Sequence, residues 1–140
     1  MVRLEMERNS HLLRYLIIWV PMLLIAIANG AIRQLTFGKV MPELRAHQLS
    51  TAIGSVLIGL FIWAVVRLWP PASARHALSI GLVWLALTVA FEFVFGRLVM
   101  HRPWSQLFND YNVTEGRLWA VFLIWLTFAP YVFFRLRRAR

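Results

Sequence analysis

One carboxylate, Glu92, lies inside a long apolar segment of this chain, residues 77–95. It is the only acidic residue in any of the four long apolar segments. An ionised carboxylate in hydrocarbon costs roughly 3 kcal/mol on insertion scales, so such a group is paired, protonated or in contact with water. Glu92 therefore marks either a packing contact between helices or a binding site.

Other polar residues occur at the ends of the apolar segments. Asn29 and Arg33 fall on one helical face at i, i+4 spacing, and His47 and Arg117 directly precede two further segments. If successive segments cross antiparallel, all of these residues reach the same end of the molecule as Glu92. We predict a ligand-binding set of Glu92, Asn29, Arg33, His47 and Arg117, in which Glu92 forms an ion pair with Arg33 or Arg117.

Two interpretations of this cluster are open. In the first, it is an outward-facing polar pocket centred on Glu92, which binds or transports a small ligand, a cation or a proton. In the second, it is an ion pair and hydrogen-bond network that fixes the register of the helices. Loss of one partner from a buried pair is damaging in both cases, so damage from substitution alone does not separate them.

Enzyme chemistry has little support in the sequence. The chain has no cysteine, which excludes disulfides, thiol catalysis and thiolate metal sites. His47 and His101 have no dense metal-binding spacing with Glu43, Asp110 or Glu92, so we expect no metal and no cofactor. Nucleophile elbows, phosphate-binding glycine loops and dinucleotide fingerprints are missing, and no catalytic residue is predicted. A membrane-embedded enzyme acting on a lipid or quinone remains the third alternative.

The elements that would position these residues are membrane spans. Of the 140 residues, 60% are hydrophobic and 15% charged, and the apolar residues occur in four blocks. These blocks are residues 12–32, 49–69, 77–95 and 118–134, each near the ~20 residues that cross a membrane as a helix. The sequence therefore predicts one all-α domain over residues 1–140, a polytopic membrane protein built as a four-transmembrane-helix bundle.

Local signals refine the helix boundaries. Pro42 suits the first turn of the second helix, and we expect Asn9 or Ser10 to cap the first. Asn112 and Glu115 have the spacing of a capping box that would open the fourth helix. Between the third and fourth spans, an apolar i, i+3, i+4, i+7 pattern predicts a short helix at the membrane interface. That pattern consists of Trp104, Leu107, Phe108 and Tyr111.

Charge predicts orientation. Fifteen Lys and Arg against six Asp and Glu give a net charge of +9, but these charges flank spans, so no nucleic-acid partner is expected. Both termini and the second loop hold nine basic residues, against six in the first and third loops, which predicts cytoplasmic termini. The nine are Arg3, Arg8, Arg14, Arg67, Arg75, Arg135, Arg137, Arg138 and Arg140. Alternatively, the first segment is a signal peptide cleaved after Ala26-Ile27-Ala28.

A stripe of small and polar residues follows one face of the second helix. Thr51, Ser55 and Gly59 continue the spacing of His47 at every fourth residue, a pattern that lets two helices approach closely. The stripe fits packing within the chain. It also fits the alternative function, a structural or accessory subunit that packs against a larger membrane complex, whereas transport would favour a homo-oligomer.

Several blocks of the chain resemble a group of small bacterial four-span membrane proteins to which no activity is assigned. They are Asn29-Gly30, Ala46-His47-Gln48-Leu49-Ser50, Phe91-Glu92-Phe93, Asp110-Tyr111-Asn112 and Gly116-Arg117-Leu118-Trp119. The resemblance implies a multi-pass protein of the bacterial inner (plasma) membrane. It implies no ligand and no catalytic residue.

Overall fold

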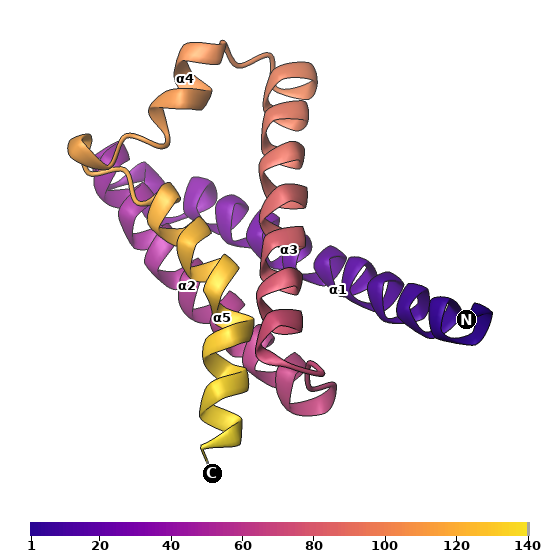
Figure 1. Cartoon of the computed structure of the whole chain (residues 1–140). Coiled ribbons are helices and arrows are strands. Elements are labelled where there is room, and N and C mark those ends of the chain that lie inside the picture. Colours follow the sequence, from indigo (N-terminus) through magenta and orange to yellow (C-terminus); the bar gives the residue numbers. More distant parts are fainter. Residues whose placement is uncertain (140) are drawn as a thin grey trace.

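The structure, a computed structural model, describes residues 1–139, and every regular element in this range is a helix (Figure 1). Arg140, the last residue of the basic tail, lies outside the described residues. The long helices are α1 (Val2–Leu35), α2 (Glu43–Leu68), α3 (Ala74–Val94) and α5 (Trp119–Arg138). The short ones are η1 (Phe37–Lys39), η2 (Phe95–Val99), α4 (Trp104–Asn109) and η3 (Val113–Glu115), and η2 continues α3 as a π-helix.

Within residues 1–139, four helices are long and apolar enough to cross a membrane. They are Val2–Leu35, Glu43–Leu68, Ala74–Val99 and Trp119–Arg138, with 34, 26, 26 and 20 residues. At 1.5 Å of rise per residue, each can cover a hydrocarbon core of about 30 Å. The prediction of an all-helical chain with four helices of spanning length is confirmed. Helix α1 begins ten residues before the predicted 12–32 segment and ends three residues after it.

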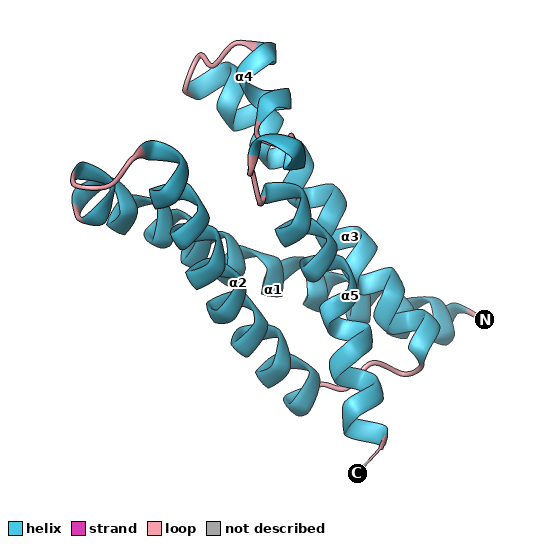
Figure 2. Cartoon of the chain, turned by 90° about the vertical axis from the view of Figure 1, so that its left-hand side faces the viewer, coloured by secondary structure: helices cyan, strands magenta, loops and turns pink. Residues whose placement is uncertain are grey.

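The long helices pack in the order α3, α5, α2, α1, so α5 lies between α2 and α3 (Figure 1). Helix α1 packs on α2 and crosses α3, while its first turns extend away from the other helices. Residues 2–14 are all exposed. In the second view, α2 and α3 diverge toward the end of the molecule that holds α4 (Figure 2). We call this the α4 end.

The apolar core lies below this divergence, where α1 meets α3. Trp84 is fully buried, and its indole Nε1 donates a hydrogen bond to the Tyr15 carbonyl at 2.9 Å. The indole Nε1 of Trp19 donates to the Thr88 hydroxyl at 3.1 Å. Because both bonds join α1 to α3, they hold these helices together at this level. Ile58, Ile62 and Leu126 from α2 and α5 complete the core.

The stripe of small residues on α2 contacts α5 within the chain. The Trp125 indole Nε1 donates to the Ser55 carbonyl at 3.1 Å, and a Cβ at Gly59 would lie 3.0 Å from the same ring. The closest helix approach is between α3 and α5, where a Cβ at Gly81 would lie 1.8 Å from the Thr127 carbonyl oxygen. Because Gly59 and Gly81 have no side chain, α5 can lie close to both α2 and α3.

Pro42 is the N-cap of α2, one residue before the first turn in which it was predicted, and two capping predictions are wrong. Helix α1 begins at Val2, and the Ser10 hydroxyl donates to the Glu7 carbonyl at 2.8 Å instead of capping a helix. Asn112 and Glu115 belong to the η3 turn, and Gly116 follows with φ of 84° before α5 begins. A left-handed residue cannot continue a right-handed helix, so the capping box does not open α5.

We predict that Gly81→Ala destabilises the protein, because its new Cβ would overlap the Thr127 carbonyl and push α3 away from α5. Overpacking of this kind costs about 1–3 kcal/mol. Gly30→Ala is the matched control, since a Cβ there meets nothing within 4 Å and both sites gain the same helix propensity. Thermal unfolding in detergent should show a lower Tm for Gly81→Ala alone. Equal Tm changes in the two variants would contradict this account.

Candidate functional site

A cavity of about 540 Å³ lies between α1, α2 and α3 at the α4 end of the molecule. All five residues of the predicted binding set line it: Asn29, Arg33, His47, Glu92 and Arg117. The four long helices all contribute to its walls, because Trp119 and Phe122 of α5 also line it. The structure therefore brings together residues that are up to 88 positions apart in the sequence, from Asn29 to Arg117.

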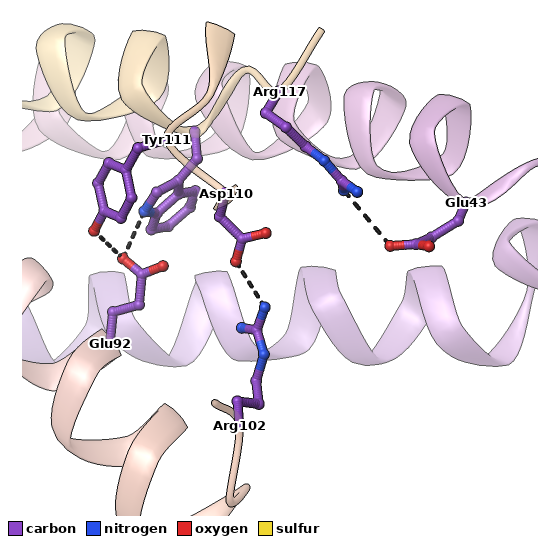
Figure 3. A network of polar contacts seen from close by, with 7 residues as sticks. Glu43, Glu92, Arg102, Asp110, Tyr111 and Arg117 are labelled. Atoms are coloured by element: carbon purple, nitrogen blue, oxygen red, sulfur yellow. Dashed lines mark hydrogen bonds and ion pairs between the residues drawn. The ribbon is translucent and has the colours of Figure 1, made fainter. Parts of the chain in front are cut away.

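The Glu92 carboxylate is held by two neutral donors (Figure 3). Its Oε2 accepts a hydrogen bond from the Tyr111 hydroxyl and another from the Trp119 indole Nε1, both at 2.6 Å. Its Oε1 has no hydrogen-bond partner among residues 1–139. Every buried polar side-chain atom in this range has a partner, so Oε1 is not buried. Oε1 is therefore accessible, and its side chain is one of those that line the cavity.

The predicted ion pair of Glu92 with Arg33 or Arg117 is wrong within the described part of the chain. Arg117 Nη1 instead lies 3.5 Å from Glu43 Oε1, and Arg33 Nη1 donates to the Ser50 hydroxyl at 3.4 Å. The physical requirement behind the prediction was that a carboxylate in an apolar helix needs partners. Two neutral hydrogen-bond donors give Glu92 these partners without a cation.

Residues 100–118, which connect η2 to α5, form one wall of the cavity and are fastened at several points. Within the segment, Arg102 Nη2 donates to Asp110 Oδ2 at 2.9 Å (Figure 3). At its end, the Gln48 side chain donates from Nε2 to the Gly116 carbonyl at 2.9 Å. Together with the Arg117–Glu43 and Tyr111–Glu92 contacts, these bonds attach the segment to both α2 and α3.

Asn29 joins α1 to α2 on the opposite wall. Its Nδ2 donates to the Ser50 carbonyl at 2.8 Å and lies 3.2 Å from the Ser50 hydroxyl. A Cβ at Gly54 would lie only 2.8 Å from the same Nδ2, so glycine at that position leaves room for the Asn29 amide. The amide of Asn29 therefore holds α1 against α2. Arg33, one helical turn further along α1, contacts the same Ser50.

His47 lines the cavity but its ring forms no hydrogen bond with residues 1–139. Within the same range, no group of three or more His, Cys, Asp and Glu side chains is placed to hold a metal ion. The residues of the site are instead suited to hydrogen bonding and charge pairing with a ligand. A carboxylate oxygen, guanidinium groups and an imidazole face one space.

Sequence reasoning missed several residues of the site. The sequence patterns place Tyr111 in the interfacial helix and Trp119 at the start of the 118–134 segment, although each has a donor that a buried carboxylate needs. Arg102 and Asp110 form an ion pair that their separation of eight residues in a loop does not predict. Ser50 was not predicted either. It precedes Thr51 of the small-residue stripe and lies on the α2 face that contacts Asn29 and Arg33 of α1.

Comparison of the chain with protein-family models, with curated proteins and with solved structures finds no match.

We predict that Tyr111 stays protonated at pH values where an exposed tyrosine ionises. Burial raises the pKa of Tyr111 above its usual 10.0, and the hydrogen bond to Glu92 and its charge raise it further. Because the pKa is higher in the folded state, stability from protonated Tyr111 is present below pH 10.0 and is lost as pH rises through the folded value. The phenolate absorbance of the parent and of Tyr111→Phe is measured as pH rises. The difference between them, which reports on Tyr111, should appear above pH 10.0.

Glu92→Gln tests the cause of this shift. The substitution removes the negative charge that opposes ionisation, so the Tyr111 transition should move to lower pH. An unchanged transition in Glu92→Gln would contradict the Tyr111–Glu92 hydrogen bond.

Proposed function

We propose that this chain is an integral membrane protein whose polar cavity binds a small ligand through Glu92. The observation that carries the proposal is the open Oε1 of Glu92, an acceptor with no protein partner among residues 1–139. Intramembrane ionisable residues are functional by default, and a ligand that donates to Oε1 would complete the coordination of this carboxylate. Asn29, Arg33, His47 and Arg117 would contribute the other polar contacts.

The four long helices would form a bundle with both termini in the cytoplasm. The supporting observation is the basic bias of the termini and of the α2–α3 turn. The α4 end, and the cavity with it, would then face the outside of the cell. Helix α4 would lie at the membrane surface, because its Trp104 and Phe108 are exposed while Leu107 is buried. The resemblance to bacterial four-span proteins favours the inner membrane.

Transport is the natural extension of binding in such a cavity. A single chain with four spans offers one lateral cavity, so an enclosed path across the membrane would require a homo-oligomer. We therefore place ligand binding first and transport second.

A second candidate function is an accessory subunit of a larger membrane complex. It is favoured by an apolar groove of about 640 Å³ between α2 and α5, which includes Gly59, Trp63 and Trp125. Ser55 and Gly59 are already in contact with the Trp125 indole, so the small-residue stripe is partly occupied within the chain. A partner would therefore contact the aromatic rim of the groove more than the stripe itself.

We predict that the cavity is reached by water from the outer side of the membrane. The chain has no cysteine, so single-cysteine variants report on one position each. Gly30 lines the cavity, and a Cβ there meets nothing within 4 Å. Gly30→Cys in sealed vesicles should react with a membrane-impermeant cationic thiosulfonate added on the outer side. Mass spectrometry of the intact chain measures the labelling.

Leu24→Cys is the control, because Leu24 is on α1, is 60% exposed and does not line the cavity. This position should face lipid and remain unlabelled from both sides. No labelling of Gly30→Cys from either side would contradict a water-accessible cavity and favour the accessory-subunit function. Labelling only from the inner side would overturn the orientation.

A further inference from the structure

The charged groups of the cavity are unequally matched. Arg102 is paired with Asp110, and Arg117 with Glu43. In contrast, Arg33 on α1 and Glu92 on α3 have no partner of opposite charge within residues 1–139. Arg33 and Glu92 line the cavity from different helices. A ligand in the cavity would therefore meet one unpaired cation and one unpaired carboxylate. A ligand that carries both charges would satisfy both groups.

Away from the charged groups, most of the cavity lining is apolar. Toward the middle of α1 it is lined by Leu23, Ala26 and Ile27, and from α2 and α5 by Ile58 and Phe122. A smaller space of about 30 Å³ continues in this direction between Trp19, Met22 and Leu126. The charged groups thus lie near the α4 end, with a mainly apolar region below them. This division fits a molecule with a charged head and an apolar tail.

The cavity is also open at its side. Helices α1 and α3 are joined by the indole bonds of Trp19 and Trp84, which lie below it. Above those bonds, Ile27 of α1 and Phe95 of η2 line the cavity and are 51% and 39% exposed. In a chain embedded in a bilayer, exposed apolar surface at this level faces lipid. An amphiphile could enter between α1 and α3 without leaving the membrane.

We infer that the ligand is a zwitterionic amphiphile with an ammonium and a phosphate in its headgroup, as in an aminophospholipid. The inference rests on the proposed binding function and specifies its ligand class. The ammonium N–H groups donate to Oε1 of Glu92, and the phosphate accepts from the Arg33 guanidinium. The acyl chain occupies the apolar part of the cavity and continues into the bilayer. A quaternary ammonium headgroup has no N–H donor and loses the first contact.

Lipid titration of the detergent-purified full chain, followed by native mass spectrometry, tests this inference. Three lipids with the same dioleoyl chains and the same phosphate test the ammonium contact: phosphatidylethanolamine, phosphatidylcholine and phosphatidylglycerol. We expect phosphatidylethanolamine to bind about tenfold more tightly than either other lipid, because neither of them has an ammonium N–H that donates to Glu92. Chain-free glycerophosphoethanolamine should bind much more weakly. Equal binding of this soluble headgroup would overturn the lipid assignment in favour of a water-soluble zwitterion.

Variants assign the preference to residues. Glu92→Gln should remove the preference for phosphatidylethanolamine. Arg33→Gln should weaken the binding of all three lipids, because each carries the phosphate, whereas Glu115→Gln and Arg45→Gln should change neither the preference nor the affinity. The two control residues are exposed and do not line the cavity. If Glu92→Gln does not fold, Gly30→Leu blocks the cavity from a position with free space, with exposed Ala31→Leu as its control.

The ligand class and the binding function can fail separately. Equal affinities of the parent for all three lipids would overturn the ligand class, as would a preference that survives Glu92→Gln or lipid affinities that Arg33→Gln leaves unchanged. If Gly30→Cys is still labelled from outside, the cavity remains an accessible binding site for another ligand. If it is not labelled, the proposed function fails with it.

Discussion

The need to hydrogen-bond one carboxylate in an apolar helix governs the α4 end of this protein. Glu92 cannot rely on water on the packed side of α3, so Oε2 accepts from Tyr111 and Trp119. These donors come from the 100–118 segment and from the start of α5. The carboxylate therefore fixes where the segment folds back and where the last long helix begins. The contacts of Arg117 and Gln48 then secure the same segment to α2.

The cavity follows from how α1 is held. Its indole and carbonyl contacts with α3 lie at the level of Tyr15 and Trp19, whereas Asn29 and Arg33 are bonded to Ser50 of α2. Helix α1 thus joins α3 at one level and α2 at the other. Because α2 and α3 diverge toward the α4 end, space is left between them (Figure 2). The cavity has an apolar and a polar part because the α1 residues that line it change from apolar at Leu23 to polar at Arg33.

The long helices were predictable because spanning length and hydropathy are local properties of the sequence. The gathering of Asn29, Arg33, His47, Glu92 and Arg117 was also predictable, since each lies near the same end of an antiparallel helix. The pairing among them was not. Charge rules favour an arginine for Glu92, but Tyr111 reaches it only because the irregular 100–118 segment folds back, and no periodicity encodes that path. The Arg102–Asp110 pair depends on the same local geometry.

The two interpretations of Glu92, a packing contact and a binding group, apply to different oxygens of one side chain. Oε2 is fully engaged by Tyr111 and Trp119, which makes it a structural acceptor. Oε1 has no partner among the described residues and is not enclosed, and the Glu92 side chain lines the cavity. The bonds to Oε2 hold the carboxylate in one orientation, so Oε1 is held in place as well. If Glu92 binds a ligand as proposed, packing preorganises the binding group, and the network that fixes the helices is part of the site.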